Sequence, residues 1–175
     1  MNKMSAHLLF GLFLMLFLSL QVKAVDYELP DLNGQIQSLD QYKGKWVIVN
    51  YWATWCGTCV KELPDLISLH EDNNEAGDVI VVGVNFETIS LKRLKNFVTK
   101  HAIPYTVLRT EPVAMTPLGP VPALPATYII DPNGKTVAGQ VGIVTQKNLE
   151  DYIESKRGAD EYVGTAVPLK RNVKS

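Results

Sequence analysis

The chain contains two cysteines, Cys56 and Cys59, which are separated by two residues and preceded by an apolar run at 46–52. This order predicts a buried strand that leads into a helix beginning at the first cysteine. A thiol at a helix N-terminus lies among unpaired backbone N–H groups and at the positive end of the helix dipole. Both favour the thiolate, which is the form that attacks disulfides. Because one helical turn brings the two sulfurs within bonding reach, the pair predicts a redox centre.

The first 24 residues have the pattern of an export leader. Lys3 supplies a positive charge, residues 7–20 form an apolar core, and Val22-Lys23-Ala24 matches a signal-peptidase site. The core is shorter than the roughly 18 apolar residues of a membrane span, and the absence of a nearby cysteine excludes lipidation. We expect cleavage after Ala24 and a periplasmic protein. An uncleaved leader that anchors the protein to the inner membrane is the alternative.

A purely structural disulfide is the competing interpretation of a cysteine pair in an exported protein. A bridge across two intervening residues closes a very short loop, so it removes little entropy from the unfolded chain. Apolar residues make up 46% of the sequence, which is enough to build a core without a covalent link. The redox interpretation is therefore preferred.

Length and charge indicate one domain. Removing residues 1–24 from the 175-residue chain leaves 151 residues, a length typical of a single domain. We place this domain at residues 25–157 and expect residues 158–175 to form a flexible tail. The leader contains two lysines and no acidic residue, so its loss changes the formal net charge from −1 to −3. No basic face is present, so we do not expect nucleic acid as a partner. We also expect a monomer.

Periodicity predicts an α/β fold, with a central mixed β-sheet flanked by helices and an added N-terminal β-hairpin. Turn-forming residues at 33–34 and 131–134 predict two antiparallel hairpins. Right-handed crossovers join the parallel strands, and we expect helices on both faces of the sheet. The predicted strands lie at 46–52, 78–85, 105–108, 126–131 and 135–141, and the predicted helices at about 57–71, 91–98 and 149–153.

Four segments contain motifs of a known family: 29–34 (LPDLNG), 44–56 (GKWVIVNYWATWC), 59–64 (CVKELP) and 124–131 (LPATYIID). Together they resemble the thioredoxin superfamily and, within it, the exported TlpA/ResA-type thiol–disulfide oxidoreductases. The resemblance covers roughly residues 27–155. It implies a thioredoxin-like sheet and an enzyme that exchanges disulfides.

The resemblance also implies roles for single residues. Cys56 corresponds to the exposed cysteine that attacks the substrate, and Cys59 to the more buried cysteine that resolves the mixed disulfide. Pro125 corresponds to a cis-proline that faces the cysteines, and Leu124 would pair with the substrate backbone by strand addition. An ordinary loop proline is the alternative for Pro125.

One position departs from thioredoxin, which has a buried aspartate six residues before the first cysteine. Here that position is Asn50, and an amide cannot take a proton from Cys59. Glu62, one turn after Cys59, and Glu87, at the carboxyl end of the second parallel strand, are the candidate bases. A solvated surface carboxylate is the alternative for each.

The residues beside the first cysteine, Trp55, Gly57 and Thr58, are expected to face the substrate; for Trp55 a core position is the alternative. No histidine separates the cysteines, and such a histidine would stabilise the reduced form and make a strong oxidant. We therefore expect a reductant that a membrane electron donor recharges.

Its substrates would be cysteine-containing exported proteins, and the resemblance suggests a role in cytochrome c maturation.

Residues 110–123 contain four prolines and no helical period. We expect this segment to lie beside Pro125 and to influence the choice of partner, with an inert surface loop as the alternative.

Two other function classes stay open. A copper carrier could hold soft Cu(I) between the two thiolates, although neither His70 nor His101 is expected near Cys56. A peroxidase would share the fold but would not need a cysteine pair. No histidine directly follows the second cysteine, which excludes covalent haem attachment. No cofactor or metal is expected.

Overall fold

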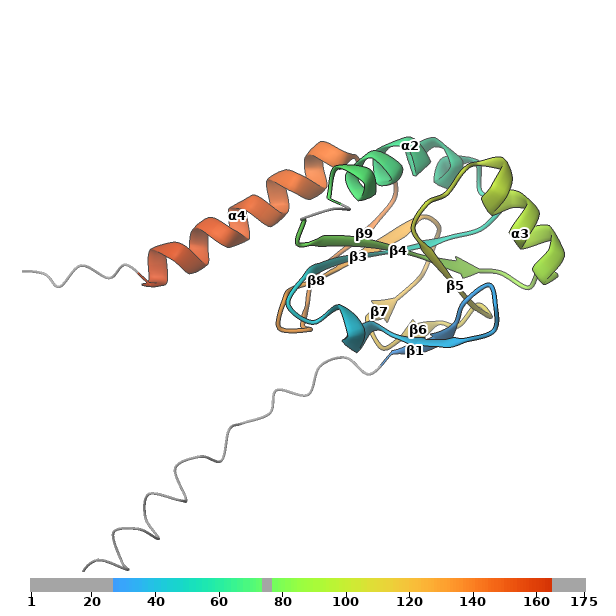
Figure 1. Ribbon diagram of the computed structural model, residues 1–175, viewed down its shortest axis with the longest axis horizontal. Coiled ribbons are helices and arrows are strands. Elements are labelled where there is room, and N and C mark those ends of the chain that lie inside the picture. Colours follow the sequence, from blue (N-terminus) through green and yellow to red (C-terminus); the bar gives the residue numbers. More distant parts are fainter. Residues whose placement is uncertain (1–26, 74–76, 165–175) are drawn as a thin grey trace, which may run out of the picture.

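The computed structural model describes residues 27–73 and 77–164, with side chains as far as residue 157. A five-stranded mixed sheet lies at its centre (Figure 1). The two β3–β4 and β4–β5 pairings are parallel, and the β3–β8 and β8–β9 pairings are antiparallel. In sheet order, the strands are β5 (Thr106–Thr110), β4 (Val79–Phe86), β3 (Trp46–Trp52), β8 (Ala126–Ile130) and β9 (Thr136–Val141).

The central strand β3 is buried along its whole length and separates two cores. Successive side chains of a strand point to opposite faces. Ile48 and Trp52 therefore enter the core beneath the helices, whereas Val49 and Tyr51 enter the core on the other face. Asn50 has the parity of Ile48 and Trp52, so its amide is placed on the helical face. This alternation explains why a polar residue lies buried beside the cysteines.

All three α-helices of the described chain pack on one face of the sheet, which corrects the expectation of helices on both faces (Figure 1). They are α2 (Gly57–Asp72), α3 (Leu91–Lys100) and α4 (Gln146–Gly164). The chain moves from β3 to β4 to β5 in one direction across the sheet. Two right-handed crossovers in the same direction place their helices on the same side.

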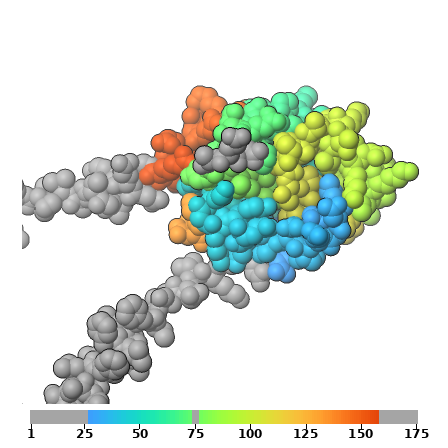
Figure 2. Space-filling view, in the orientation of Figure 1, coloured from blue at the N-terminus to red at the C-terminus, as the bar shows by residue number. Residues whose placement is uncertain are grey.

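The other face is covered by the N-terminal segment and by the proline-rich loop. The predicted hairpin is present as β1 (Glu28–Pro30) and β2 (Ile36–Ser38), and a 3-10 helix, η2 (Leu39–Tyr42), follows it. Figure 2 shows this blue-to-cyan segment on the side opposite to α2 and α3. Leu29 and Leu39 contribute to the second core. The hairpin is therefore an integral part of the domain.

The proline-rich segment at 110–123 contains a second small hairpin, which was not predicted. β6 (Met115–Thr116) pairs with β7 (Gly119–Pro120). Leu118 and Val121 are buried in the second core, and the Tyr51 hydroxyl donates to the Thr116 hydroxyl at 3.2 Å. This segment is thus attached to the central strand and is not merely a surface loop.

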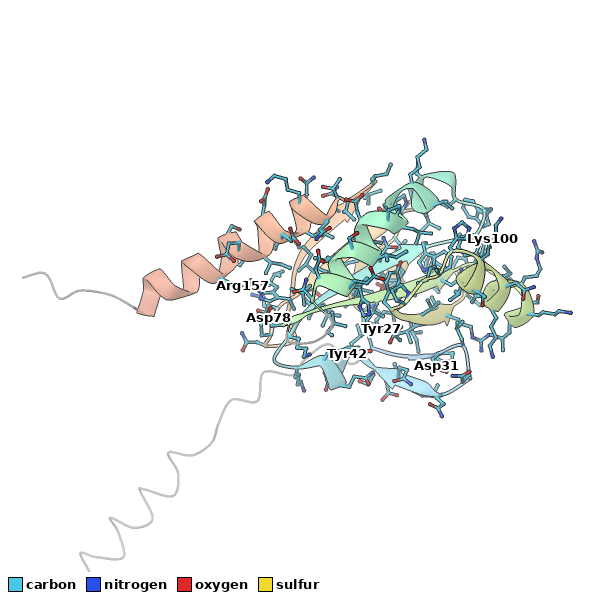
Figure 3. The ribbon with its side chains drawn as sticks, turned by 45° about the horizontal axis from the view of Figure 1, so that its top comes forward. Tyr27, Asp31, Tyr42, Asp78, Lys100 and Arg157 are labelled. Atoms are coloured by element: carbon cyan, nitrogen blue, oxygen red, sulfur yellow. A yellow bond between two sulfur atoms is a disulfide. The ribbon has the colours of Figure 1, made fainter. Side chains whose placement is uncertain are left out.

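The predicted strands and helices are confirmed to within a few residues, but α4 is longer than expected. It continues to Gly164 and so extends beyond the expected domain end at residue 157. Arg157 forms an ion pair with Asp78 near the start of β4 (Figure 3). The predicted leader and the last residues of the predicted tail lie outside the described residues. Within the described chain, no helix is long and apolar enough to cross a membrane.

Candidate active site

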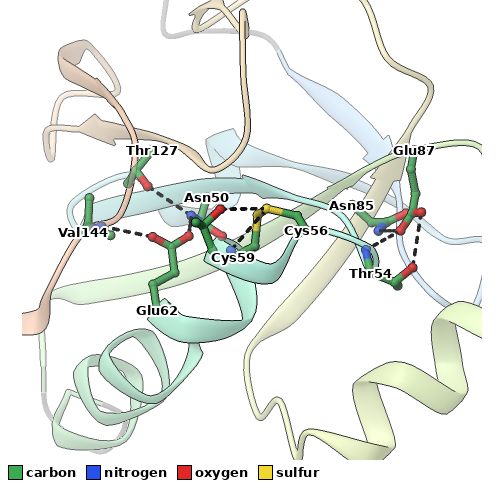
Figure 4. The surroundings of a disulfide bond; sticks show 10 residues. Asn50, Thr54, Cys56, Cys59, Glu62, Asn85, Glu87, Thr127 and Val144 are labelled. Atoms are coloured by element: carbon green, nitrogen blue, oxygen red, sulfur yellow. Dashed lines mark hydrogen bonds between the residues drawn. A yellow bond between two sulfur atoms is a disulfide. The ribbon is translucent and has the colours of Figure 1, made fainter.

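The first cysteine caps the helix that it begins. Cys56 is the N-cap of α2, and its Sγ accepts the backbone N–H of Cys59 at 3.2 Å (Figure 4). The Thr58 hydroxyl lies 3.3 Å from the same sulfur. The two cysteines form a disulfide with an S–S distance of 2.12 Å. When the bond is reduced, Cys56 Sγ would lie where an N-cap side chain accepts a hydrogen bond, and this position favours a thiolate.

Cys56 is much less exposed than expected. It is 5% exposed and Cys59 is 2% exposed, so the order of exposure is as predicted but both sulfurs are nearly buried. The reason is that both belong to the core beneath the helices, against which Leu124 also packs. The neighbours of Cys56 are open to solvent: Trp55 is 71% exposed, and Gly57 and Thr58 are exposed as well.

The loop before β8 contains the cis peptide bond predicted between Leu124 and Pro125. Pro125 is buried and Leu124 is half-buried. The Pro125 carbonyl accepts the backbone N–H of Gly142 at 2.8 Å. Gly142 has φ +103°, a conformation that strongly favours glycine. The loop at 142–144 is therefore part of the site, although the sequence marked it only by a glycine after a strand.

Glu62 is fully buried, at 0% exposure, which contradicts the alternative of a surface carboxylate. Its Oε1 accepts from Asn50 Nδ2 at 2.8 Å, and its Oε2 accepts from the Val144 backbone N–H at 3.0 Å. Burial raises the pKa of Glu62 above its ordinary value, and the bonds from Val144 and Asn50 oppose that shift. The helix thus places an acid three residues after Cys59, on the same helical face.

Asn50 also donates to the buried hydroxyl of Thr127, at 3.1 Å. These two residues are direct partners in the β3–β8 pairing. Sequence reasoning did not identify Thr127, because the pairing of strands far apart in the chain is needed to see it opposite Asn50. The amide therefore connects Glu62 on α2 to Thr127 on β8.

Glu87 has a different environment from Glu62. Its Oε1 accepts from the Thr54 backbone N–H at 2.6 Å and from Asn85 Nδ2 at 2.9 Å, and its Oε2 lies 3.3 Å from the Thr54 hydroxyl. In Figure 4 it lies on the side of Cys56 away from Glu62. None of its hydrogen bonds reaches a cysteine. Its carboxylate instead holds the segment that leads into Cys56.

The two histidines of the domain pack against aromatic rings. The His70 ring lies 5.9 Å from that of Tyr105, and the His101 ring lies 4.2 Å from that of Phe97, measured between centroids. In the described part of the chain, no group of three or more His, Cys, Asp or Glu side chains could hold a metal ion.

A mixed sheet, a cysteine pair at the N-terminus of a helix and a neighbouring cis-proline loop together define a thioredoxin-like thiol–disulfide oxidoreductase. The chain belongs to the AhpC/TSA family, whose family model matches residues 20–138.

Individual relatives agree with this assignment. Thiol–disulfide oxidoreductase ResA of Bacillus anthracis is 31% identical over 133 residues, which are 75% of each chain. Thioredoxin-like protein YneN of Bacillus subtilis (strain 168) is 32% identical over 134 residues, 75% of this chain and 77% of the other. A crystal structure of a secreted thiol–disulfide isomerase from Corynebacterium glutamicum matches with a TM-score of 0.67 and 30% identity, over 74% and 81% of the two chains. The predicted resemblance and enzyme class are confirmed.

Proposed function

We propose that the protein is an exported reductase that transfers electrons to protein disulfides through the Cys56–Cys59 pair. The main observation is that Cys56 Sγ caps α2 and accepts the Cys59 N–H, since this position stabilises a thiolate. Its neighbours Trp55, Gly57 and Thr58 are exposed, whereas Cys56 itself is only 5% exposed.

Each of the two cysteines acts as the nucleophile once in the reaction. The Cys56 thiolate attacks one sulfur of the substrate disulfide, which forms a mixed disulfide and releases a substrate thiolate. Cys59 then loses its proton and attacks the Cys56 sulfur. The Cys56–Cys59 bond forms, and the second substrate thiolate leaves. The protein is oxidised by two electrons, and the substrate disulfide is reduced to two thiolates, which exchange protons with solvent.

Glu62 is the proposed acceptor for the Cys59 proton. It is buried on the same face of α2, and its two oxygens are oriented by Asn50 and Val144. A raised pKa makes the Glu62 carboxylate a stronger base, because that pKa lies closer to neutral pH than the ordinary value does. Glu87 is better placed to position the Thr54 backbone than to accept this proton.

Substrate binding is assigned to the surface between Cys56 and the cis-proline loop. Trp55, Gly57 and Thr58 form one rim, and the half-buried Leu124 beside Pro125 forms the other. The backbone of Leu124 would pair with an extended substrate segment, so that main-chain bonds provide affinity for many sequences.

The direction of electron transfer and the cellular location are proposed from the sequence and from the relatives. The predicted leader and the secreted relative support a periplasmic protein, with anchoring to the inner membrane by an uncleaved leader as the alternative. No histidine lies between the cysteines to stabilise the reduced form. A membrane electron donor would recharge the dithiol of a monomeric protein, whose substrates are cysteine-containing exported proteins, including those of cytochrome c maturation.

The reduction potential of the pair tests this proposal. Residues 25–175 are equilibrated with thiol–disulfide buffers, and the oxidised fraction is measured. A potential near that of thioredoxin, about −270 mV, supports a reductase, whereas one near that of DsbA, about −120 mV, reverses the direction. A pair that does not cycle contradicts the redox role itself.

A further inference from the structure

A pocket of about 270 Å³ opens between α4 and the strands β8 and β9. Its walls include Ala138 from β9 and Leu149 from α4, and the exposed side chains of Gln140 and Asn148 also line it. The volume is enough for several water molecules, each of which occupies about 30 Å³ in the liquid. The pocket therefore brings solvent close to the helical face of β8.

Two buried residues of the pocket wall are hydrogen-bonded to Glu62 or to its partner Asn50. Val144 donates its backbone N–H to Glu62 Oε2, and Thr127 accepts from Asn50, which in turn donates to Glu62 Oε1. In Figure 4, Val144 lies on the side of Glu62 opposite to the cysteines. Glu62 thus lies between Cys59 and the wall of the pocket.

Glu62 has no direct path to solvent in this arrangement. It is fully buried, both of its oxygens accept hydrogen bonds, and the cysteines beside it are nearly buried. A substrate docked over Cys56 would cover the cysteine side further. While the Cys56–Cys59 disulfide persists, a proton taken from Cys59 cannot return to it, so Glu62 regains its negative charge only when that proton leaves to solvent.

We propose that this pocket is the exit route by which the proton accepted by Glu62 reaches solvent, with Val144 as its gate. The proposal rests on the proposed role of Glu62. Charge-assisted hydrogen bonds are about twice as strong as neutral ones. Protonation of Glu62 removes its charge, so it weakens the bond from the Val144 N–H. The carboxyl O–H can then turn towards water in the pocket, and loss of the proton restores the closed state.

The experiment follows the proton and the thiol chemistry separately. Reduced protein, with Cys56 as thiolate and Cys59 as thiol, is mixed with one equivalent of a nitroaromatic disulfide whose coloured thiolates stay ionised at neutral pH. The protein disulfide forms, two aromatic thiolates are released, and one proton, from Cys59, enters solution. Stopped-flow absorbance records the colour, and a pH-indicator dye in weakly buffered solution records the proton.

Two variants fill the pocket. Ala138→Phe fills it from the sheet, and Asn148→Trp fills it from the exposed rim without changing the sheet. The second variant keeps the test valid if the first does not fold. Lys147→Trp, exposed and outside the pocket wall, is the matched control. We expect colour at the wild-type rate in all three. Proton release in the filled variants should be about tenfold slower, a barrier increase of about 1.4 kcal/mol.

The outcomes separate the two proposals. Proton release that keeps pace with colour in both filled variants overturns the exit route. Glu62→Gln tests the proton acceptor alone: an unchanged rate for the second aromatic thiolate overturns the role of Glu62. A slower second thiolate in Glu62→Gln, together with prompt proton release in the filled variants, leaves the acceptor intact and rejects only the pocket.

Discussion

Asn50 and Glu62 are hydrogen-bonded to one another in the core, from Nδ2 to Oε1 at 2.8 Å. The strand position where thioredoxin has an acid therefore contains the donor, and α2 supplies the acid. Because both side chains are buried, the amide holds the carboxylate in one orientation. In the proposed mechanism the base therefore lies on the helix instead of the strand, one turn after Cys59.

Replacing Cys59 with serine should trap the first half of the reaction. Cys56 can still attack, but no second thiol is present to resolve the mixed disulfide. The variant should therefore accumulate as a covalent adduct with a disulfide-containing protein, which mass spectrometry detects. Cys56→Ser is the control and should form no adduct. Equal adduct formation by both variants would contradict the assigned order of attack.

Glu62→Gln should slow resolution of the mixed disulfide, because an amide cannot accept the Cys59 proton. General-base catalysis contributes about 10²-fold or more, so we expect a loss of that order at neutral pH. The rate should instead rise with pH as Cys59 ionises without help. A variant with wild-type rate and pH profile would exclude Glu62 as the base. Single-turnover kinetics with a disulfide peptide provide both readouts.

The raised pKa of Glu62 predicts a specific dependence of stability on pH. Between its ordinary value of 4.5 and its raised value in the folded protein, the folded state keeps a proton that the unfolded state releases. The free energy of unfolding should therefore fall as the pH rises through this window and stay lower above it. Urea titrations of the wild type and Glu62→Gln at several pH values measure the difference. A flat difference would contradict the raised pKa.

Glu87→Ala should loosen the segment before Cys56, because it removes the acceptor of the Thr54 backbone N–H. Loss of a hydrogen bond to a charged group costs about 1.5–3 kcal/mol when it is buried, and less at this half-buried donor. The Thr54 amide should also exchange faster with deuterium. Glu111→Ala is the control, since that exposed carboxylate accepts only a surface hydroxyl, from Thr88. Equal stability losses in the two variants would show that Glu87 has no special positioning role.

Alanine substitutions at Trp55 and at Trp52 should affect different properties, substrate turnover for the first and stability for the second. Trp55 is exposed, so Trp55→Ala should change stability by no more than about 0.5 kcal/mol. It should lower kcat/KM for a protein disulfide but not for a small one. Trp52 is 1% exposed and stacks on Phe97, so Trp52→Ala should cost about 3–5 kcal/mol. Unchanged kcat/KM for proteins in Trp55→Ala would remove this residue from the substrate rim.

Local signals predicted the elements well. The apolar run at 46–52, the helical spacing after Gly57 and the turns at 33–34 and 131–134 all correspond to observed elements. Each of these signals lies within one stretch of chain, where the period of apolar residues directly reflects burial on one face. The α4 helix extended further than expected, because its last turns lack the apolar period that would have marked them.

The arrangement of the site depended on contacts between distant segments. Thr127 lies opposite Asn50 only because β8 pairs with β3, and Val144 reaches Glu62 only because α4 packs beside α2. The two candidate glutamates looked alike in the sequence, since each follows an apolar segment near the cysteines. Their surroundings separate them: one is enclosed beneath the helices, and the other holds the Thr54 backbone.

The sequence by itself determined the redox chemistry of this protein, because the spacing of Cys56 and Cys59 and the helix start between them are local properties of the chain. It also determined the fold class, through the order of strands and helices. Only the tertiary structure decided that the helices share one face, that Cys56 is nearly buried and that Glu62 is enclosed. Burial and hydrogen-bond partners depend on which distant segments meet, and no local pattern specifies that.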